Sequence, residues 1–200
     1  MMEICVKHLH KSYGETPVLR DVTFSAGPEI ICVEGPSGAG KTTLLRLLLG
    51  LEKPDGGSIS GAERLRWAAV FQEDRLLEHL DAAGNLRFAL GADFRPQAAA
   101  ELLADLGLPA VNGKPAREYS GGMKRRLALA RALLAKSDAL VLDEPFSGLD
   151  EESRARAEEV VRRRTAGKPV FLVTHDSGGA DRFRASVFRL EKLSGEERGI

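Results

Sequence analysis

A glycine-rich loop that ends in lysine and threonine is the part of this sequence best suited to chemistry. Its residues, hereafter the phosphate loop, are Gly35, Pro36, Ser37, Gly38, Ala39, Gly40, Lys41 and Thr42. They follow an apolar run (residues 29–33) and precede a helical pattern that Gly50 closes. Glycines let backbone N–H groups turn inward around a phosphate, and the helix start adds partial positive charge. With Lys41 on the β and γ phosphates and Thr42 on Mg²⁺, the pattern predicts binding of ATP with magnesium.

Two adjacent carboxylates, Asp143 and Glu144, follow another apolar run at residues 139–142. The carboxyl ends of strands are where α/β sheets bind their ligands. We expect Asp143 to bind magnesium and Glu144 to act as general base on the attacking water, which predicts ATP hydrolysis. A polar strand end before Pro145 is the alternative, so this interpretation depends on the phosphate loop.

A second glycine-rich helix start, hereafter the Gly-Gly segment, consists of Ser120, Gly121, Gly122 and Met123. Ser120 suits the cap position, and the glycines would let a phosphate approach the exposed N–H groups. An ordinary helix cap is the alternative. Because one nucleotide has no evident use for two such starts in one small domain, the pattern favours a nucleotide held by a second copy of the chain.

Single residues at strand ends extend the candidate site. Gln72 follows the strand pattern at residues 67–71, and His175 follows the one at residues 170–173, so both are expected near the γ phosphate. Either could instead be an ordinary loop side chain. Tyr13, in a turn after a strand, could be partly exposed core or a platform for stacking adenine. The histidines have no zinc spacing.

The elements that must position these residues are those of one α/β domain. Alternating patterns at residues 3–10 and 18–25 predict a small antiparallel β layer. Continuous apolar runs predict buried parallel strands at residues 29–33, 139–142 and 170–173. Helices are expected at residues 42–49 and 151–164, and helical patterns broken by glycine and proline predict an inserted helical subdomain at residues 74–119. The expected organisation is a single domain over residues 1–200.

Charge and composition bound the function further. The 200 residues carry 29 basic and 29 acidic side chains, a net charge of +0, which gives no long-range attraction to nucleic acid or anionic lipid. The run at residues 162–164 lies in a helix with i to i+4 pairs, which is typical of a solvated face. Those pairs are Glu152 with Arg156, Glu158 with Arg162 and Glu159 with Arg163. We therefore expect no nucleic-acid partner.

The cysteines, the hydrophobic stretches and the N-terminus indicate the expected cellular location. Cys5 and Cys32 lie inside apolar runs and are interpreted as core residues in a reducing compartment. No apolar stretch reaches the roughly 18 to 20 residues of a membrane helix, and the N-terminus has no signal-peptide pattern. A soluble, cytoplasmic protein is expected, with a short polar tail at residues 194–200.

Taken in chain order, these motifs, together with Ser147, Gly148, Leu149 and Asp150, resemble the complete motif series of the ABC transporter ATPase subunit. The resemblance implies that Tyr13 stacks on adenine, and that the phosphate loop, Thr43 and Gln72 contact nucleotide and magnesium. It implies a head-to-tail homodimer in which the Gly-Gly segment faces the other copy's ATP and Asp150 communicates across the dimer. Lys41, Glu144 as base and His175 at the γ phosphate would carry catalysis.

Finer features resemble the importers of nitrate, sulfonate and taurine: Met123, residues 71–77 and residues 143–146. The implied partners are integral membrane permease subunits and, indirectly, a solute-binding protein, with the chain peripheral on the inner face of the cell membrane. Tyr119 stands where the family usually has Leu, Met123 where it often has Gln, and the interval from Lys41 to Gln72 is short. A soluble ABC ATPase acting on DNA or ribosomes, or a regulator that dimerises without turnover, are the alternatives.

Overall fold

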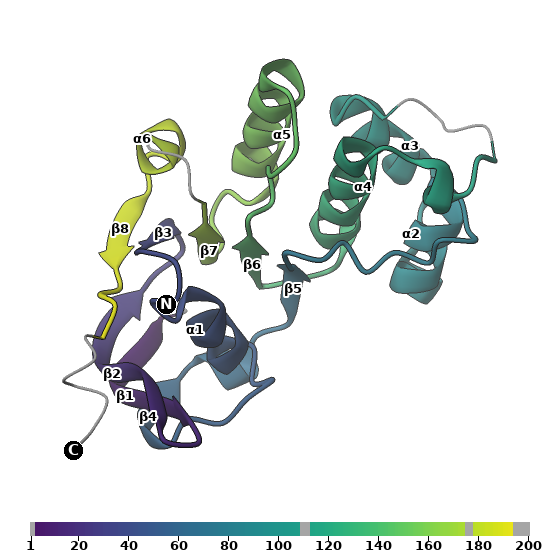
Figure 1. The fold of residues 1–200 in the computed structure, drawn as a ribbon. Helices are drawn as coiled ribbons and strands as arrows, with labels where there is room; N and C mark the ends of the chain where they lie inside the picture. Colours follow the sequence, from purple (N-terminus) through teal and green to yellow (C-terminus); the bar gives the residue numbers. More distant parts are fainter. Residues whose placement is uncertain (1–2, 109–112, 175–177, 194–200) are drawn as a thin grey trace.

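Two β-sheets with one helix between them form the framework of the fold (Figure 1). The computed structural model describes residues 3–108, 113–174 and 178–193. The strands are β1 (Ile4–Tyr13), β2 (Thr16–Ala26), β3 (Ile30–Glu34), β4 (Gly56–Ser60), β5 (Trp67–Val70), β6 (Ala139–Asp143), β7 (Val170–Val173) and β8 (Ser186–Arg189). The helices are α1 (Lys41–Leu48), α2 (Ala82–Leu90), α3 (Pro96–Asp105), α4 (Gly121–Leu134), α5 (Glu151–Arg164) and α6 (Gly179–Phe183).

The first sheet is antiparallel, with strand order β2-β1-β4. Its alternating sequence places one face against the core, and Ile4, Val6 and Leu9 of β1 are buried there. The turn after Tyr13 joins β1 to β2, as the sequence predicts. Between α1 and β5, the chain forms β4 and a 3₁₀ turn (Ala62–Arg64) that leads to β5.

The second sheet is parallel, with strand order β5-β6-β7-β3-β8. Every residue of β6 and β7 is buried, which explains their uninterrupted apolar sequences. This confirms the predicted α/β class with a P-loop NTPase core and a small antiparallel layer. The sequence pattern did not indicate β8, whose residues are exposed or half-buried and so do not form a continuous apolar run.

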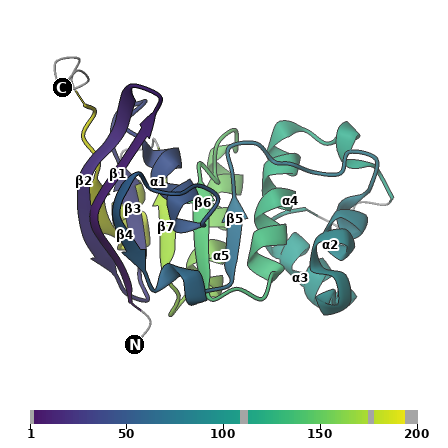
Figure 2. The same cartoon turned by 90° about the horizontal axis from the view of Figure 1, so that it is seen from below.

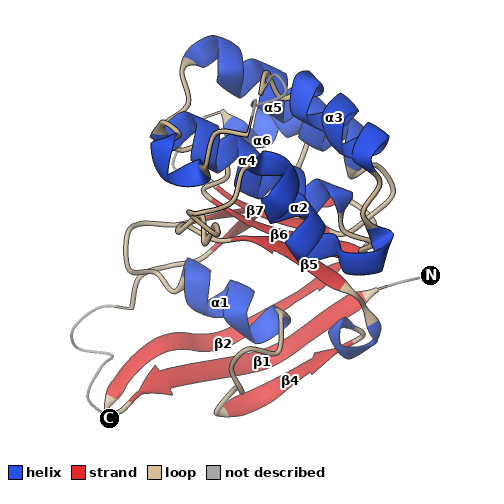
Figure 3. Cartoon of the chain, turned by 90° about the vertical axis from the view of Figure 1, so that its right-hand side faces the viewer, coloured by secondary structure: helices blue, strands red, loops and turns tan. Residues whose placement is uncertain are grey.

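Helix α1 lies between the two sheets (Figure 3). Leu44, Leu45, Leu47 and Leu48 are all buried there, in one cluster with side chains of β1, β2, β3, β6 and β7. Each buried leucine contributes about 1.5–3 kcal/mol of transfer free energy. Because α1 begins directly after the phosphate loop, this packing fixes the loop at the carboxyl end of β3.

Helices α2, α3 and α4 form a unit beyond the β5 edge of the parallel sheet (Figure 2). Leu86 of α2, Leu102 of α3 and Leu127 of α4 share one buried cluster, which continues to β5 and β6. Asn85 is 3% exposed and stabilises the segment before α2 through hydrogen bonds to the backbone of Leu77 and Leu80. The helical unit thus includes α4, which follows residues 74–119 in the chain.

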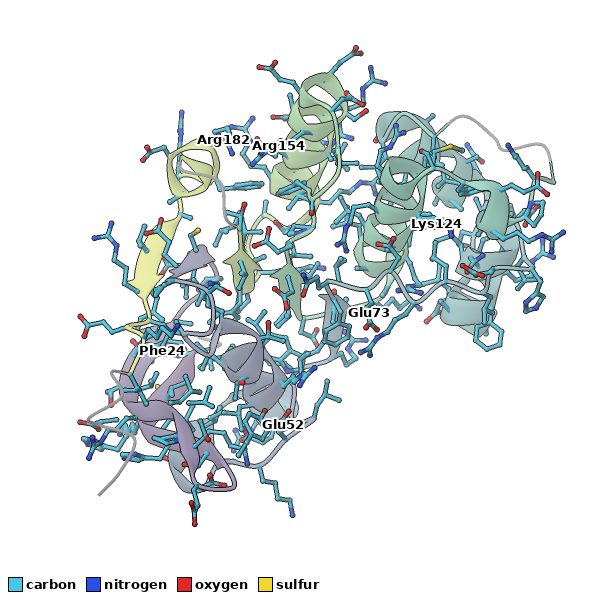
Figure 4. The ribbon with its side chains drawn as sticks, viewed as in Figure 1. Phe24, Glu52, Glu73, Lys124, Arg154 and Arg182 are labelled. Atoms are coloured by element: carbon cyan, nitrogen blue, oxygen red, sulfur yellow. The ribbon has the colours of Figure 1, made fainter. Side chains whose placement is uncertain are left out.

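The ion pairs of α5 differ in part from those predicted from the sequence. Arg156 pairs with Glu152, as predicted. Arg162 pairs with Glu159 instead of Glu158, and Arg163 pairs with Asp105 of α3. Glu158 is 9% exposed and lies between two other arginines, Arg154 at 3.0 Å and Arg182 of α6 at 2.9 Å. These two arginines are labelled in Figure 4. Spacing along one helix could not indicate partners that other helices supply.

The two cysteines are free, and they differ in burial. Cys32 is buried in β3, as the sequence predicts, and burial with the nearby charges of Glu34 and Glu144 raises the pKa of its thiol to about 11. Cys5 of β1 is only half-buried, so it is less of a core residue than its apolar neighbours suggest. The predicted tail, residues 194–200, lies outside the described residues.

Candidate nucleotide site

The phosphate loop joins the carboxyl end of β3 to the start of α1 and borders a cavity of about 400 Å³. Gly38 and Gly40 have φ of 80° and 90°, a left-handed backbone that costs little only in glycine. Gly40 is the residue before the first turn of α1, and no side chain caps that turn. The backbone N–H groups of the helix start therefore remain donors for an anion.

The Lys41 side chain bonds to the backbone of the phosphate loop. Its Nζ donates to the carbonyl oxygens of Gly35 at 2.6 Å and Pro36 at 3.1 Å, and its side chain lines the same cavity. The residue is 8% exposed, so its ammonium charge acts through little screening water. This places a positive charge where the phosphates of a nucleotide on the loop would lie.

Two oxygen ligands suited to magnesium lie at the floor of the cavity. The Thr42 hydroxyl donates to Asp143 Oδ2 at 3.0 Å, which joins the start of α1 to the end of β6. Burial raises the pKa of Asp143, although the bond from Thr42 and the charge of Lys41 act in the opposite direction. A hydroxyl beside a carboxylate is a hard donor set of the kind Mg²⁺ takes together with phosphate oxygens. The residues present therefore fit the ion.

Glu144 lies next to Asp143 in a backbone conformation that glutamate rarely adopts. Its φ is +52°, and its N–H donates to the carbonyl of Val173 at 3.0 Å. Phe146, two residues on, is buried and stacks on Phe183 of α6 with ring centroids 5.7 Å apart. This packing stabilises the strained turn. The Glu144 side chain lines the nucleotide cavity.

Gln72 and Tyr13 line the same cavity from two other elements. Gln72 lies two residues after Val70, the last residue of β5. Tyr13 ends β1, is 46% exposed, and its hydroxyl donates to Glu52 Oε2 at 2.5 Å. That bond fixes the ring at the rim, where an adenine could stack on it. Thr43, Ser37, Gly38 and Gly40 complete the predicted residues in the lining.

The Gly-Gly segment lies elsewhere, at the start of α4, and does not line this cavity. Ser120 caps α4 by accepting a bond from the N–H of Met123 at 3.2 Å. A Cβ on Gly122 would lie 3.4 Å from Gly148 O and 3.4 Å from Leu149, so residues 120–123 and 147–150 are neighbours. Asp150 caps α5 through the N–H of Ser153 at 2.8 Å. The two segments thus form one surface outside the cavity.

The other predicted residues do not line the cavity or lie outside the described residues. Gly35, Pro36 and Ala39 belong to the phosphate loop but do not line the cavity. Ala39 is buried, and Gly35 approaches the backbone of Leu190. Gly121 is the first residue of α4. His175 lies outside the described residues, so its predicted contact with the γ phosphate stays a prediction.

A larger hollow of about 800 Å³ lies between β2 and the segment after β8. It contains an exposed pair, His8 and Asp21, whose Nδ1 and Oδ1 are 2.7 Å apart, and none of the predicted site residues. The smaller cavity is the candidate site because it joins a helix start, a buried lysine and a carboxylate pair. No group of three or more histidine, cysteine, aspartate or glutamate side chains that could hold a metal ion occurs among the described residues.

Sequence reasoning missed two kinds of functional residue. Glu52, which holds Tyr13, is separated from it by 39 positions. Arg125 and Arg131 of α4 donate to backbone carbonyls around Gln72, but in the sequence they are members of a basic helix with no sign of burial. Local pattern carries no signal for such contacts.

A family model described as "ABC transporter" matches residues 19–147. Taurine import ATP-binding protein TauB of Pseudomonas putida is 43% identical, covering 82% of this chain and 68% of that protein. Aliphatic sulfonates import ATP-binding protein SsuB 1 of Rhodococcus jostii (strain RHA1) is 42% identical, covering 82% of this chain and 69% of that protein.

A solved structure titled "Structure of ATP binding subunit of ABC transporter" superposes with a TM-score of 0.83. It is 27% identical and covers 96% of this chain and 88% of its own. Within the described part of the chain, no helix is both long and apolar enough to span a membrane.

Proposed function

Because this chain belongs to the ABC transporter family, whose ATP-binding members hydrolyse ATP, we propose that it is the ATPase subunit that drives import of a small solute through membrane permease subunits. The observation that carries the proposal is the single cavity of about 400 Å³ onto which Lys41, Thr42, Asp143 and Glu144 converge. The solute is inferred to be an anion of the taurine or sulfonate type, since such importers are the relatives.

Each residue of the cavity has a role in this proposal. Tyr13 stacks on the adenine, and the N–H groups at the phosphate loop and the α1 start bind the phosphates. Lys41 exchanges its bonds to Gly35 and Pro36 for bonds to the phosphates. Thr42, Asp143 and Gln72 hold magnesium, which supplies neutralising charge at the transferring phosphoryl group.

Glu144 is the proposed general base. Its carboxylate accepts a proton from a water molecule aligned with the γ phosphate, and the strained turn keeps the side chain at the cavity wall. His175 contacts the γ phosphate in this proposal. No covalent intermediate is needed, because positioning and charge stabilisation suffice for phosphoryl transfer to water.

Two copies are proposed to pair head to tail. The surface formed by residues 120–123 and 147–150 would cover the ATP of the other copy, with Asp150 at the dimer contact. Residues 74–119 are proposed to be an inserted helical subdomain within a single domain that spans residues 1–200. Together with the Gln72 region it would bind the permease at the inner face of the cell membrane, and a solute-binding protein would act through that permease.

The test is ATP turnover by the purified chain, alone and with its permease. We expect Glu144→Gln to lower kcat by about 10²–10⁴-fold, the usual contribution of general acid–base catalysis, while ATP still binds. Glu63→Gln, on the exposed turn before β5, is the matched control and should leave kcat unchanged. A Glu144→Gln protein as active as the parent would refute the assignment.

A further inference from the structure

Arg125 is a buried charged side chain on α4 that does not line the nucleotide cavity. The residue is 6% exposed. Its Nη1 donates to Phe71 O at 2.7 Å and its Nη2 donates to Gln72 O at 2.7 Å. Nη1 also lies 3.2 Å from Asp74 Oδ1, so a carboxylate compensates the buried charge. The planar fork of one guanidinium therefore holds two consecutive carbonyls, which a lysine ammonium cannot reproduce.

A second arginine of the same helix holds the residues that follow. Arg131 donates to Asp74 O at 2.9 Å and to Arg75 O at 2.7 Å. Residues 71–75, hereafter the Gln72 loop, belong to no helix or strand. Their position is therefore set by two side chains of α4, in addition to the end of β5.

The N-terminal end of α4 is the Gly-Gly segment, which does not line the nucleotide cavity. Only one residue, Lys124, separates Met123 from Arg125. The helix is 14 residues long, about 21 Å, and Arg125 is its fifth residue, so continuous helix joins Arg125 to the Gly-Gly segment. A displacement of its N-terminus is therefore transmitted to the Gln72 loop through the arginine bonds.

We propose that Arg125 is a positioning residue that couples the Gly-Gly segment, in contact with one ATP, to Gln72, in contact with the other. The inference rests on the proposed function, because it takes Gln72 as a ligand of magnesium and the γ phosphate. When the second copy's ATP draws the start of α4 toward it, Arg125 moves the Gln72 carbonyl and with it the side chain. Neither ATP site then closes fully unless the other does.

The experiment uses the full 200-residue chain in three variants: Arg125→Gln, Arg125→Lys and the control Arg162→Gln. Arg162 is an exposed arginine of α5 that pairs with Glu159 on the same helix. Hydrogen exchange is followed with and without Mg-ATP in the Glu144→Gln background, so this readout needs no turnover. Peptides covering residues 35–45, 71–77 and 120–125 are compared.

We expect Mg-ATP to protect all three segments in the parent and in the control. In Arg125→Gln, residues 35–45 should keep their protection while the protection gained by residues 71–77 falls about tenfold. In the otherwise native chain, kcat should fall about tenfold with KM changed less than threefold, and Arg125→Lys should recover less than half of the lost rate. If Arg125→Gln does not fold, Arg125→Lys alone carries the same test.

Two outcomes would overturn the inference: an Arg125 variant that retains nucleotide-induced protection of residues 71–77, or one that loses protection at residues 35–45 to the same degree. The second would mean general loosening of the fold. Failure of the proposed function is distinguishable, because then the parent itself would neither gain protection from Mg-ATP nor hydrolyse ATP.

Discussion

Two glycines of the phosphate loop should respond differently to alanine, one mainly in stability and the other mainly in ATP binding. Both have a positive φ, +153° at Gly35 and +80° at Gly38. A Cβ on Gly35 would lie 2.5 Å from the backbone oxygen of Leu190, closer than any real contact, and 3.2 Å from Ala39 Cβ. A Cβ on Gly38 would have its nearest neighbour at 3.9 Å and would stand at the wall of the nucleotide cavity.

The expected loss of stability follows from these contacts. Left-handed backbone costs alanine about 1–2 kcal/mol, and the reduced freedom of the unfolded chain offsets about 0.4–1 kcal/mol. Gly38→Ala should therefore lower the free energy of unfolding by about 0.5–1.5 kcal/mol. Gly35→Ala adds about 1–3 kcal/mol of overpacking against a backbone atom, for about 2–4 kcal/mol in all. At about 2–4 °C per kcal/mol, Tm should fall by about 1–6 °C and about 4–16 °C respectively.

Thermal unfolding and ATP titration, measured on both variants, separate the two effects. Gly38→Ala should bind ATP about tenfold more weakly, because its methyl group enters the space for the phosphates. Gly35→Ala, assayed well below its Tm, should bind ATP within about threefold of the parent. Equal Tm shifts, or a larger shift for Gly38→Ala, would refute the reasoning from these contacts.

Three further variants address the magnesium ligands and the rim of the cavity. The pKa of Asp143 is raised on folding, so its contribution to stability is present below its unfolded value, near 4, and is lost as pH rises through the folded value. Asp143→Asn should therefore raise the Tm of the metal-free protein at pH 7 while abolishing its Mg-dependent ATPase activity; a lower Tm at pH 7 would contradict this. Tyr13→Ala should weaken ATP binding about 5- to 150-fold, since stacking on an aromatic ring contributes about 1–3 kcal/mol. Tyr13→Phe loses only the bond to Glu52 and should stay within about threefold, so equal losses for the two would argue against stacking.

The sequence predicted those parts of the fold that adjacent residues determine. The phosphate loop, the buried strands and helix α5 each have their pattern within one short run, and each is found where expected. Strand β8 was missed because it is a half-exposed edge with no apolar run. The sequence predicts a solvated Glu158 because one of its two partners, Arg182, is 24 positions away and is brought close only by the fold.

The same distinction applies to the site. Lys41, Thr42 and Asp143 could be named because a loop and a strand end determine their positions. The positions of Tyr13 and Gln72 depend on Glu52 and Arg125, which nothing in their own neighbourhood indicates. Residues that touch a ligand belong to recognisable motifs, whereas residues that orient them are scattered along the chain.

The separation of the Gly-Gly segment from the nucleotide cavity gives the strongest argument for a second copy. Ser120 and Asp150 each cap a helix, and their segments adjoin through Gly122 and Gly148 on a surface apart from Lys41 and Glu144. The α4 start has no acidic residue in its first turn and suits an anionic partner, whereas the α5 start is already occupied by the Asp150 carboxylate. Since the nucleotide site proposed in the chain does not use this surface, a second copy related by a two-fold axis would bring its own ATP to the α4 start, and the same pair of surfaces would meet twice.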